Sequence, residues 1–265
     1  MKSKFDEALT LFQNGQLNKA KDICLEIIKV QPNNFDILHL LGLIAFQTKN
    51  YLKSVEIIDR AIQVKPNDAD IYNFHAVVLI HLKKFEEAIK SWNCAIKIKP
   101  NYAEAYYNRG NAFFELQKLE SAIESFDKAI EIKPDYAEAY NNRGNALKDF
   151  KKLESAIESY NKAIQINPDY DEAHFNCGNV LKDFKKLESA IESFDKAIQI
   201  NPNFAEAYNN RGNTLLELQK LESAIESFDK AIQINPDYAE AYYNRGNTFL
   251  ELQKLESAIE SYNKA

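Results

Sequence analysis

The sequence AEAYYNRGNAFFELQKLESAIESFDKAIEIKPDY occupies residues 103–136, and residues 137–170 repeat it as AEAYNNRGNALKDFKKLESAIESYNKAIQINPDY. Such a fixed period of 34 residues indicates a repeat architecture. All seven prolines lie on this period: Pro32, Pro66, Pro100, Pro134, Pro168, Pro202 and Pro236. We therefore expect a single array over residues 1–265, with repeats 1–34, 35–68, 69–102, 103–136, 137–170, 171–204, 205–238 and an incomplete 239–265. Positions are counted from the first residue of each repeat.

Each repeat has the pattern of two amphipathic helices. Tyr106, Gly110 and Phe113 recur at helical spacing, and a second apolar set follows after a short break. The second helix is expected to end just before the proline at position 32, because proline disfavours helical geometry in the preceding residue and lacks an amide hydrogen. An Asn or Asp at position 33, with an acid three residues later, predicts a capping box at all seven joints, such as Asp135 with Glu138.

Composition and charge narrow the class of protein. Hydrophobic residues make up 45% and charged residues 27% of the chain, which is typical of a folded helical protein. The net charge is −6 and no Lys/Arg run is longer than two residues, so nucleic acid is not expected as a partner. Residues 1–102 carry a net charge of +3 and residues 103–265 a net charge of −9, which would steer a cationic or polar partner toward the C-terminal part. The alternative is a solubilising acidic surface.

The cysteines and the hydropathy of the sequence indicate the cellular compartment. Cys24, Cys94 and Cys177 lie at three different repeat positions, so neither a disulfide framework nor a zinc site is expected. An apolar signal segment is missing near the N-terminus, where acids follow the first lysines, and no stretch has the length of a membrane span. We expect a cytoplasmic protein that makes no membrane contact.

The repeat positions resemble the tetratricopeptide repeat (TPR) family over the whole chain. Its signature has an aromatic residue at position 4, Gly or Ala at 8, Ala at 20, an aromatic residue at 24, Ala at 27 and Pro at 32. Position 20 departs only at Ser54 and position 27 only at Ile27. The resemblance implies an all-α fold, a right-handed superhelical solenoid of stacked helix-turn-helix units. Small residues would let paired helices touch, while bulky residues at position 24 would fill the space between units. The chain departs at position 15, where the family often has a helix-ending glycine and only Gly15 matches.

The two ends of the array differ in character. Lys4 and Glu7 make the first repeat polar at positions 4 and 7, which suits an N-terminal cap. The sequence stops at Ala265, inside an expected second helix. We interpret it as a fragment of a longer protein, or as an array whose last repeat is covered, for example by end-to-end self-association.

Catalysis is not expected. An active site needs different groups that converge in one pocket, whereas the polar residues here recur along a rod. The histidines His39, His75, His81 and His174 do not share a helical face with metal-ligand spacing. We therefore predict no catalytic residues, no metal and no cofactor.

Asparagine is the more informative signal. Asparagines recur at positions 6 and 9, which share a face of the first helix: Asn108, Asn142, Asn176, Asn210 and Asn244, with Asn111, Asn145, Asn179, Asn213 and Asn247. Asparagine is a mediocre residue inside a helix, so its repetition needs a reason. The TPR resemblance implies that first helices line a concave groove, and similar asparagine ladders hold peptide main chain in the TPR arms of O-linked N-acetylglucosamine transferases. The alternative is a consensus residue that bridges adjacent helices.

Two further sets adjoin the asparagines. Arginines at position 7 could bind carboxylates of a ligand, or pair within the chain with acids such as Glu104, Glu138, Glu206 or Glu240: Arg109, Arg143, Arg211 and Arg245. The carboxylate clamp of chaperone-tail receptors is absent, because position 5 lacks the lysine. Tyr107 and Tyr243 at position 5 could be aromatic contacts for a ligand, or could pack between repeats.

Two functions fit the sequence. The first is a scaffold that binds a partner protein or an extended peptide in its groove, with weak sequence discrimination because the repeats are nearly equal. The second is the substrate-recognition arm of a multidomain transferase whose catalytic domain lies beyond residue 265. The apolar run at residues 38–44 resembles the N-terminal arms of bacterial glycosyltransferases or sulfotransferases, although it could also be core between repeats.

Overall fold

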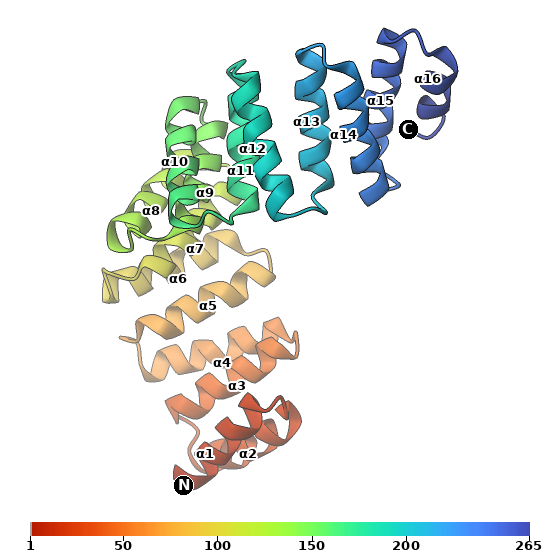
Figure 1. The fold of residues 1–265 in the computed structure, drawn as a ribbon. Coiled ribbons are helices and arrows are strands. Elements are labelled where there is room, and N and C mark those ends of the chain that lie inside the picture. The colour runs from red at the N-terminus through yellow and green to blue at the C-terminus, as the bar shows by residue number, and fades with distance from the viewer. Residues whose placement is uncertain (1) are drawn as a thin grey trace. The chain divides into compact units, whose positions relative to one another are not determined.

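A computed structural model describes residues 2–265, with side chains from residue 4 onward. These residues form sixteen α-helices and no strand (Figure 1). The helices are α1 (Lys2–Gln13), α2 (Leu17–Val30), α3 (Phe35–Gln47), α4 (Tyr51–Val64), α5 (Ala69–His81), α6 (Phe85–Ile98), α7 (Ala103–Glu115), α8 (Leu119–Ile132), α9 (Ala137–Asp149), α10 (Leu153–Ile166), α11 (Asp171–Asp183), α12 (Leu187–Ile200), α13 (Ala205–Glu217), α14 (Leu221–Ile234), α15 (Ala239–Glu251) and α16 (Leu255–Tyr262). The all-α prediction of two helices per repeat is confirmed.

Two compact units divide the chain, residues 1–134 and residues 135–265, which we call the N-terminal unit and the C-terminal unit. Within each unit the first helix of a repeat packs on the second helix of the same repeat, as α9 does on α10. The second helix then packs on the first helix of the next repeat, as α10 does on α11. Each unit is therefore the expected stack of helix-turn-helix repeats, while one continuous array stays a prediction.

Glycine at position 8 and an aromatic ring at position 24 build the core of repeats 4 to 8. A Cβ atom added to Gly144 would lie 2.5 Å from Cε1 of Tyr160, so only glycine lets the ring lie this close to the first helix. The side chain of Tyr160 is fully buried. Gly212 and Phe228 repeat this contact, with a corresponding distance of 2.6 Å. The role predicted for the small residues at position 8 is thereby confirmed.

The capping boxes expected at the joints are wrong. Helix α9 begins at position 1, so its N-cap is Tyr136 and not Asp135, and no side chain caps it. Asp135 stands one residue too early to reach the first-turn amides. Where the N-cap of a first helix is Asn or Asp a cap does form, since Oδ1 of Asn34 accepts a hydrogen bond from the amide of Ile37 and Asp68 accepts two such bonds. The N-terminal ends of most first helices thus depend on packing for their stability.

A left-handed residue at position 15 links the two helices of each repeat. The φ angle is +62° at Lys151 and between +56° and +60° at the other six non-glycine residues of this position, and it is +72° at Gly15. The amide of Lys152 donates to the carbonyl of Leu147 and that of Lys151 to the carbonyl of Lys148, which is the Schellman ending of a helix. The missing glycines therefore do not change the turn, but seven residues with a Cβ adopt a conformation that glycine adopts more easily.

Substitution of Lys151 by glycine is expected to raise the free energy of unfolding by about 1 kcal/mol. The left-handed conformation costs a non-glycine residue roughly 1–2 kcal/mol, and the greater freedom of glycine in the unfolded chain offsets part of the gain. Urea denaturation followed by circular dichroism measures the change. The reciprocal variant Gly15→Lys is expected to lose a similar amount, and a K151G variant that is less stable than the parent would contradict the prediction.

Candidate peptide-binding face

The asparagines of positions 6 and 9 form one face on the first helices. In the C-terminal unit this face comprises eight side chains on α9, α11, α13 and α15, and we call it the amide face: Asn142, Asn145, Asn176, Asn179, Asn210, Asn213, Asn244 and Asn247. In the N-terminal unit, Asn108 and Asn111 occupy the same positions on α7. All ten are partly exposed, so their amide groups are neither fully buried nor fully surrounded by water.

Hydrogen bonds join position 6 to the preceding repeat in the C-terminal unit. Nδ2 of Asn176 donates to Oδ1 of Asn141 at 3.1 Å, a residue at position 5. The bond from Asn244 to Asn209 is the same in kind and length, at 3.1 Å. A bridging role for position 6, which the sequence left as the alternative, is therefore present. A primary amide can take part in four hydrogen bonds, and the bridge uses only one of its donors. The asparagine at position 6 therefore keeps capacity for further hydrogen bonds.

The bridge changes where position 5 is aromatic. Phe175 has no side-chain oxygen that could accept this bond. Nδ2 of Asn210 donates instead to Oδ1 of Asn179 at 2.8 Å. Asn179 stands at position 9 of the preceding repeat. The hydrogen-bond pattern of the amide face consequently repeats every two repeats and not every one.

Position 5 was not recognised as part of this network from the sequence. Asn141 and Asn209 are buried, and Asn209 donates a further bond to Oε1 of Glu240 at 3.0 Å. These two asparagines could have been identified from the sequence, because asparagine and aromatic residues alternate at position 5 from repeat 4 onward. A buried amide that has its partners holds the neighbouring first helices in one register.

Tyrosines at position 24 orient two of the position 9 asparagines. Oη of Tyr160 donates to Oδ1 of Asn145 at 2.8 Å, and Tyr262 makes the same bond to Asn247 at 2.7 Å. Burial raises the pKa of Tyr160 well above its usual range, so the phenol keeps its proton and remains a donor. With the carbonyl oxygen bonded in this way, the Nδ2 group of Asn145 is directed away from the ring.

The arginines of position 7 are directed toward the second helices. Nε of Arg211 lies 2.6 Å from Oδ1 of Asp195, and Nη1 of Arg245 lies 2.6 Å from Oδ1 of Asp229. Arg143 donates to the hydroxyl of Ser159 at 2.8 Å. The pairing within the chain that the sequence offered as an alternative is thus present, but its expected partners were wrong.

Helical geometry explains why other acids are the partners. Arg109 donates to Asn93 at 2.8 Å and to Ser125 at 3.2 Å, not to Glu104. Positions 2 and 7 are five residues apart, or roughly 140° around a helix with 3.6 residues per turn, so Glu104, Glu138, Glu206 and Glu240 point elsewhere. A ligand role for the arginines stays a prediction, and their bonds lie off the amide face.

The aromatic residues of position 5 pack on the ring at position 24 of their own repeat. The ring centroids of Tyr107 and Phe126 are 6.0 Å apart, and those of Tyr243 and Tyr262 are 5.9 Å apart. Tyr243 nevertheless remains 55% exposed. Packing is therefore present at both tyrosines, and contact with a ligand stays a prediction for them.

Two family models match the chain. A TPR repeat model matches residues 76–117, 110–150, 144–184, 183–219 and 212–253, and a tetratricopeptide repeat model matches residues 5–70. The chain belongs to the tetratricopeptide repeat family. The resemblance expected from the prolines and small residues is thereby confirmed.

Solved TPR structures resemble this TPR protein. YrrB, described as a TPR protein with an unusual peptide-binding site, is 27% identical, with 76% of this chain and 100% of that chain covered and a TM-score of 0.61. MamA is also 27% identical, with coverage of 62% and 96% and a TM-score of 0.59. The C-terminal part of a TPR protein from Cytophaga hutchinsonii has a TM-score of 0.76 at 14% identity, covers 91% and 98%, and supports the fold alone. No curated protein matches the chain.

Two of the cysteine thiols of this TPR protein are buried. Burial raises the pKa of the Cys24 and Cys177 thiols to about 11, so they are protonated at neutral pH and poor nucleophiles. Among the described residues, no group of three His, Cys, Asp or Glu side chains is placed to hold a metal ion. Over the same part of the chain, every helix is too short or too polar to span a membrane.

Proposed function

We propose that this TPR protein is a protein-interaction scaffold that binds an extended peptide across the amide face of the C-terminal unit. The observation that carries the proposal is the row of eight partly exposed asparagines on four consecutive first helices. Carboxamides offer donors and acceptors to the main chain of a peptide whatever its sequence. Because the repeats are nearly equal, an extended ligand would gain affinity from small, similar contributions along the face.

The bridges between repeats support a ligand role as well as a structural one. Asn176 and Asn210 are each held by a hydrogen bond to the preceding repeat, which limits the rotamers that their side chains can adopt. A preoriented group loses less conformational entropy when it binds than a free one does. The peptide-binding site named for YrrB, which is 27% identical, is consistent with such a role for the fold.

Charge favours a cationic peptide as the partner. The C-terminal unit carries 15 Lys and Arg residues against 22 Asp and Glu residues, a net charge of −7, whereas the N-terminal unit carries 18 against 17. A field of this sign raises the association rate of a basic ligand and does so less at high salt. The partner's affinity is therefore expected to fall as ionic strength rises.

Alanine at Asn142, Asn176 and Asn210 is expected to weaken peptide binding by at least about tenfold, since each of the three lost hydrogen bonds removes roughly 0.5–1.5 kcal/mol. The probe is a 15-residue peptide selected from a random library against the full chain. Fluorescence polarisation gives its dissociation constant for the parent and the variant.

A triple variant within the first of these repeats provides the control. Asn161, Lys162 and Gln165 are exposed on α10 and lie off the amide face, so alanine at all three should leave affinity unchanged. Circular dichroism checks that both variants keep their helicity. Equal affinity of the asparagine variant and the parent would contradict the proposal, and so would a random library that yields no binder.

The second function, a recognition arm of a transferase, stays a prediction. The same face would then hold the acceptor peptide. A peptide that binds the chain in solution is compatible with both functions, so the experiment above tests the face and not the larger protein to which it could belong.

A further inference from the structure

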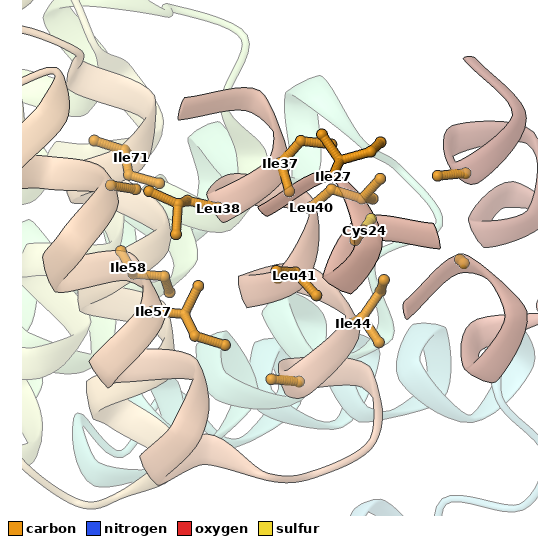
Figure 2. Close-up of a cluster of buried hydrophobic side chains, with 14 of the residues drawn as sticks. Cys24, Ile27, Ile37, Leu38, Leu40, Leu41, Ile44, Ile57, Ile58 and Ile71 are labelled. Atoms are coloured by element: carbon orange, nitrogen blue, oxygen red, sulfur yellow. The ribbon is translucent and has the colours of Figure 1, made fainter. Parts of the chain in front are cut away.

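The N-terminal unit contains a pocket of about 560 Å³, and neither Asn108 nor Asn111 lines it. Helix α3 forms its floor, and α2 and α4 form its walls. Seven apolar residues line it: Leu25, Ile28, Leu38, Leu41, Ile44, Ala45 and Ile57. Figure 2 shows Leu41 and Ile44 of α3 with Ile57 of α4 in this region. The volume falls within the range of about 300–1,000 Å³ that is typical of small-molecule sites.

The apolar lining is specific to this place in the chain. Positions 7 and 23 are Leu41 and Ile57 here, whereas they are Arg143 and Ser159 in repeat 5. The corresponding hollow of repeat 5 is lined by Arg143, Ser159 and other polar residues, and that of repeat 7 by their counterparts. In those two repeats the guanidinium group at position 7 donates a hydrogen bond to the serine hydroxyl at position 23. The exchange of arginine and serine for leucine and isoleucine thus turns a polar hollow into an apolar one.

Most of the polar lining residues, all except Arg60, lie at one end of the pocket. Asn18 and Lys21 lie in the first two turns of α2, Asn50 and Lys53 lie at the start of α4, and Thr48 follows the end of α3. The apolar residues Leu25, Leu41 and Ile57 come next along the three helices. The pocket therefore has a polar, basic end and an apolar interior.

The charge of the lining is positive. It includes Lys21, Lys53 and Arg60 and no carboxylate. Lys53 pairs with Glu56 at 2.7 Å, but both side chains are more than half exposed, and such surface pairs are weak. Nη2 of Arg60 donates to the carbonyl oxygen of Pro32 at 3.0 Å. An anionic group at the basic end would meet complementary charge.

We propose that this pocket binds a free long-chain fatty acid. Its carboxylate would lie between Lys21 and Lys53, and its acyl chain would cover Leu25, Leu41 and Ile57. A pocket lined by three adjacent helices suits a single acyl chain better than a partner helix, which is about 10 Å across with its side chains. The site lies in the N-terminal unit and is independent of peptide binding to the amide face.

Isothermal titration with octanoate, decanoate, dodecanoate and tetradecanoate below their micelle concentrations tests the proposal on the full chain. Affinity is expected to rise about tenfold for each two added methylene groups until the pocket is filled, since each buried methylene adds a constant increment. Dodecyltrimethylammonium, which has a similar chain and the opposite charge, should bind at least tenfold more weakly than dodecanoate. Equal binding of the two, or no saturable binding at any chain length, overturns the proposal.

Variants locate the site. The pair Leu41→Arg and Ile57→Ser installs the residues of repeat 5 and should abolish binding of dodecanoate. Lys21→Gln with Lys53→Gln leaves the apolar lining intact and should weaken it about tenfold, which keeps the test valid if the first pair unfolds its repeat. Leu52→Ser is the control, because Leu52 is 71% exposed on α4 and does not line the pocket. Parent-like binding by the lysine pair, or loss of binding by L52S, contradicts the assignment.

Discussion

Replacement of Tyr160 by alanine is expected to lower the free energy of unfolding by about 3–5 kcal/mol, the usual cost of removing a large aromatic side chain from a core. The ring is fully buried and lies directly against the backbone at Gly144, so its loss leaves a cavity that the helices of the repeat cannot close without moving. The variant also loses the hydrogen bond to Asn145. Urea denaturation of the full chain, followed at 222 nm, measures the change.

The chain supplies the control for this experiment. Phe126, Phe194 and Phe228 occupy the same position, so Tyr160→Phe keeps the ring and removes only the hydroxyl group. Its cost should not exceed about 1.5 kcal/mol, the upper range for one hydrogen bond. If alanine and phenylalanine cost the same, the ring is not the source of the stability that we assign to it.

A leucine at position 156 is expected to cost roughly 1–3 kcal/mol through overpacking. Ala156 is fully buried at position 20. How closely this position approaches the first helix is visible in repeat 2, where Oγ of Ser54 donates to the carbonyl of Gly42 at 2.8 Å. A leucine side chain would have to enter this contact, and either its rotamer or the helix pair would be strained. Differential scanning calorimetry measures the shift in midpoint.

The control is a serine at position 156, because repeat 2 already has a serine at position 20. Ala156→Ser adds one small polar atom that can bond to the backbone of α9, so its effect should stay within about 1 kcal/mol. An A156L variant as stable as A156S would show that the two helices approach less closely than the structure has them.

Regular spacing made the fold predictable, and local detail limited the rest. The prolines marked the helix ends correctly, with α8 ending at Ile132, two residues before Pro134. They did not reveal that the next helix begins at position 1, which moved the N-cap away from Asp135. The left-handed residue at position 15 was also hidden, because lysine and glutamine at that position carry no glycine signal.

The candidate site was predictable in outline only. The asparagines of positions 6 and 9 were identified from their repetition, which side-chain chemistry makes unusual for a helix interior. Their partners depend on which neighbour stands at position 5, and only coordinates place Asn141 within 3.1 Å of Asn176. The pocket beside Leu41 was interpretable as plain core, because an empty volume depends on how side chains pack and not on their hydrophobicity.

Asparagine and aromatic residues alternate at position 5, as Asn141, Phe175, Asn209 and Tyr243. This alternation determines by how many repeats a peptide bound across the first helices can shift and still meet the same side chains. A bound chain that slides by one repeat exchanges an amide neighbour for an aromatic one and meets a different set of partners. A slide by two repeats restores the original surroundings. Equivalent positions of the bound peptide are therefore two repeats, or 68 residues of this chain, apart. A peptide that covers two repeats has fewer equivalent binding positions than the near-identity of the repeats implies.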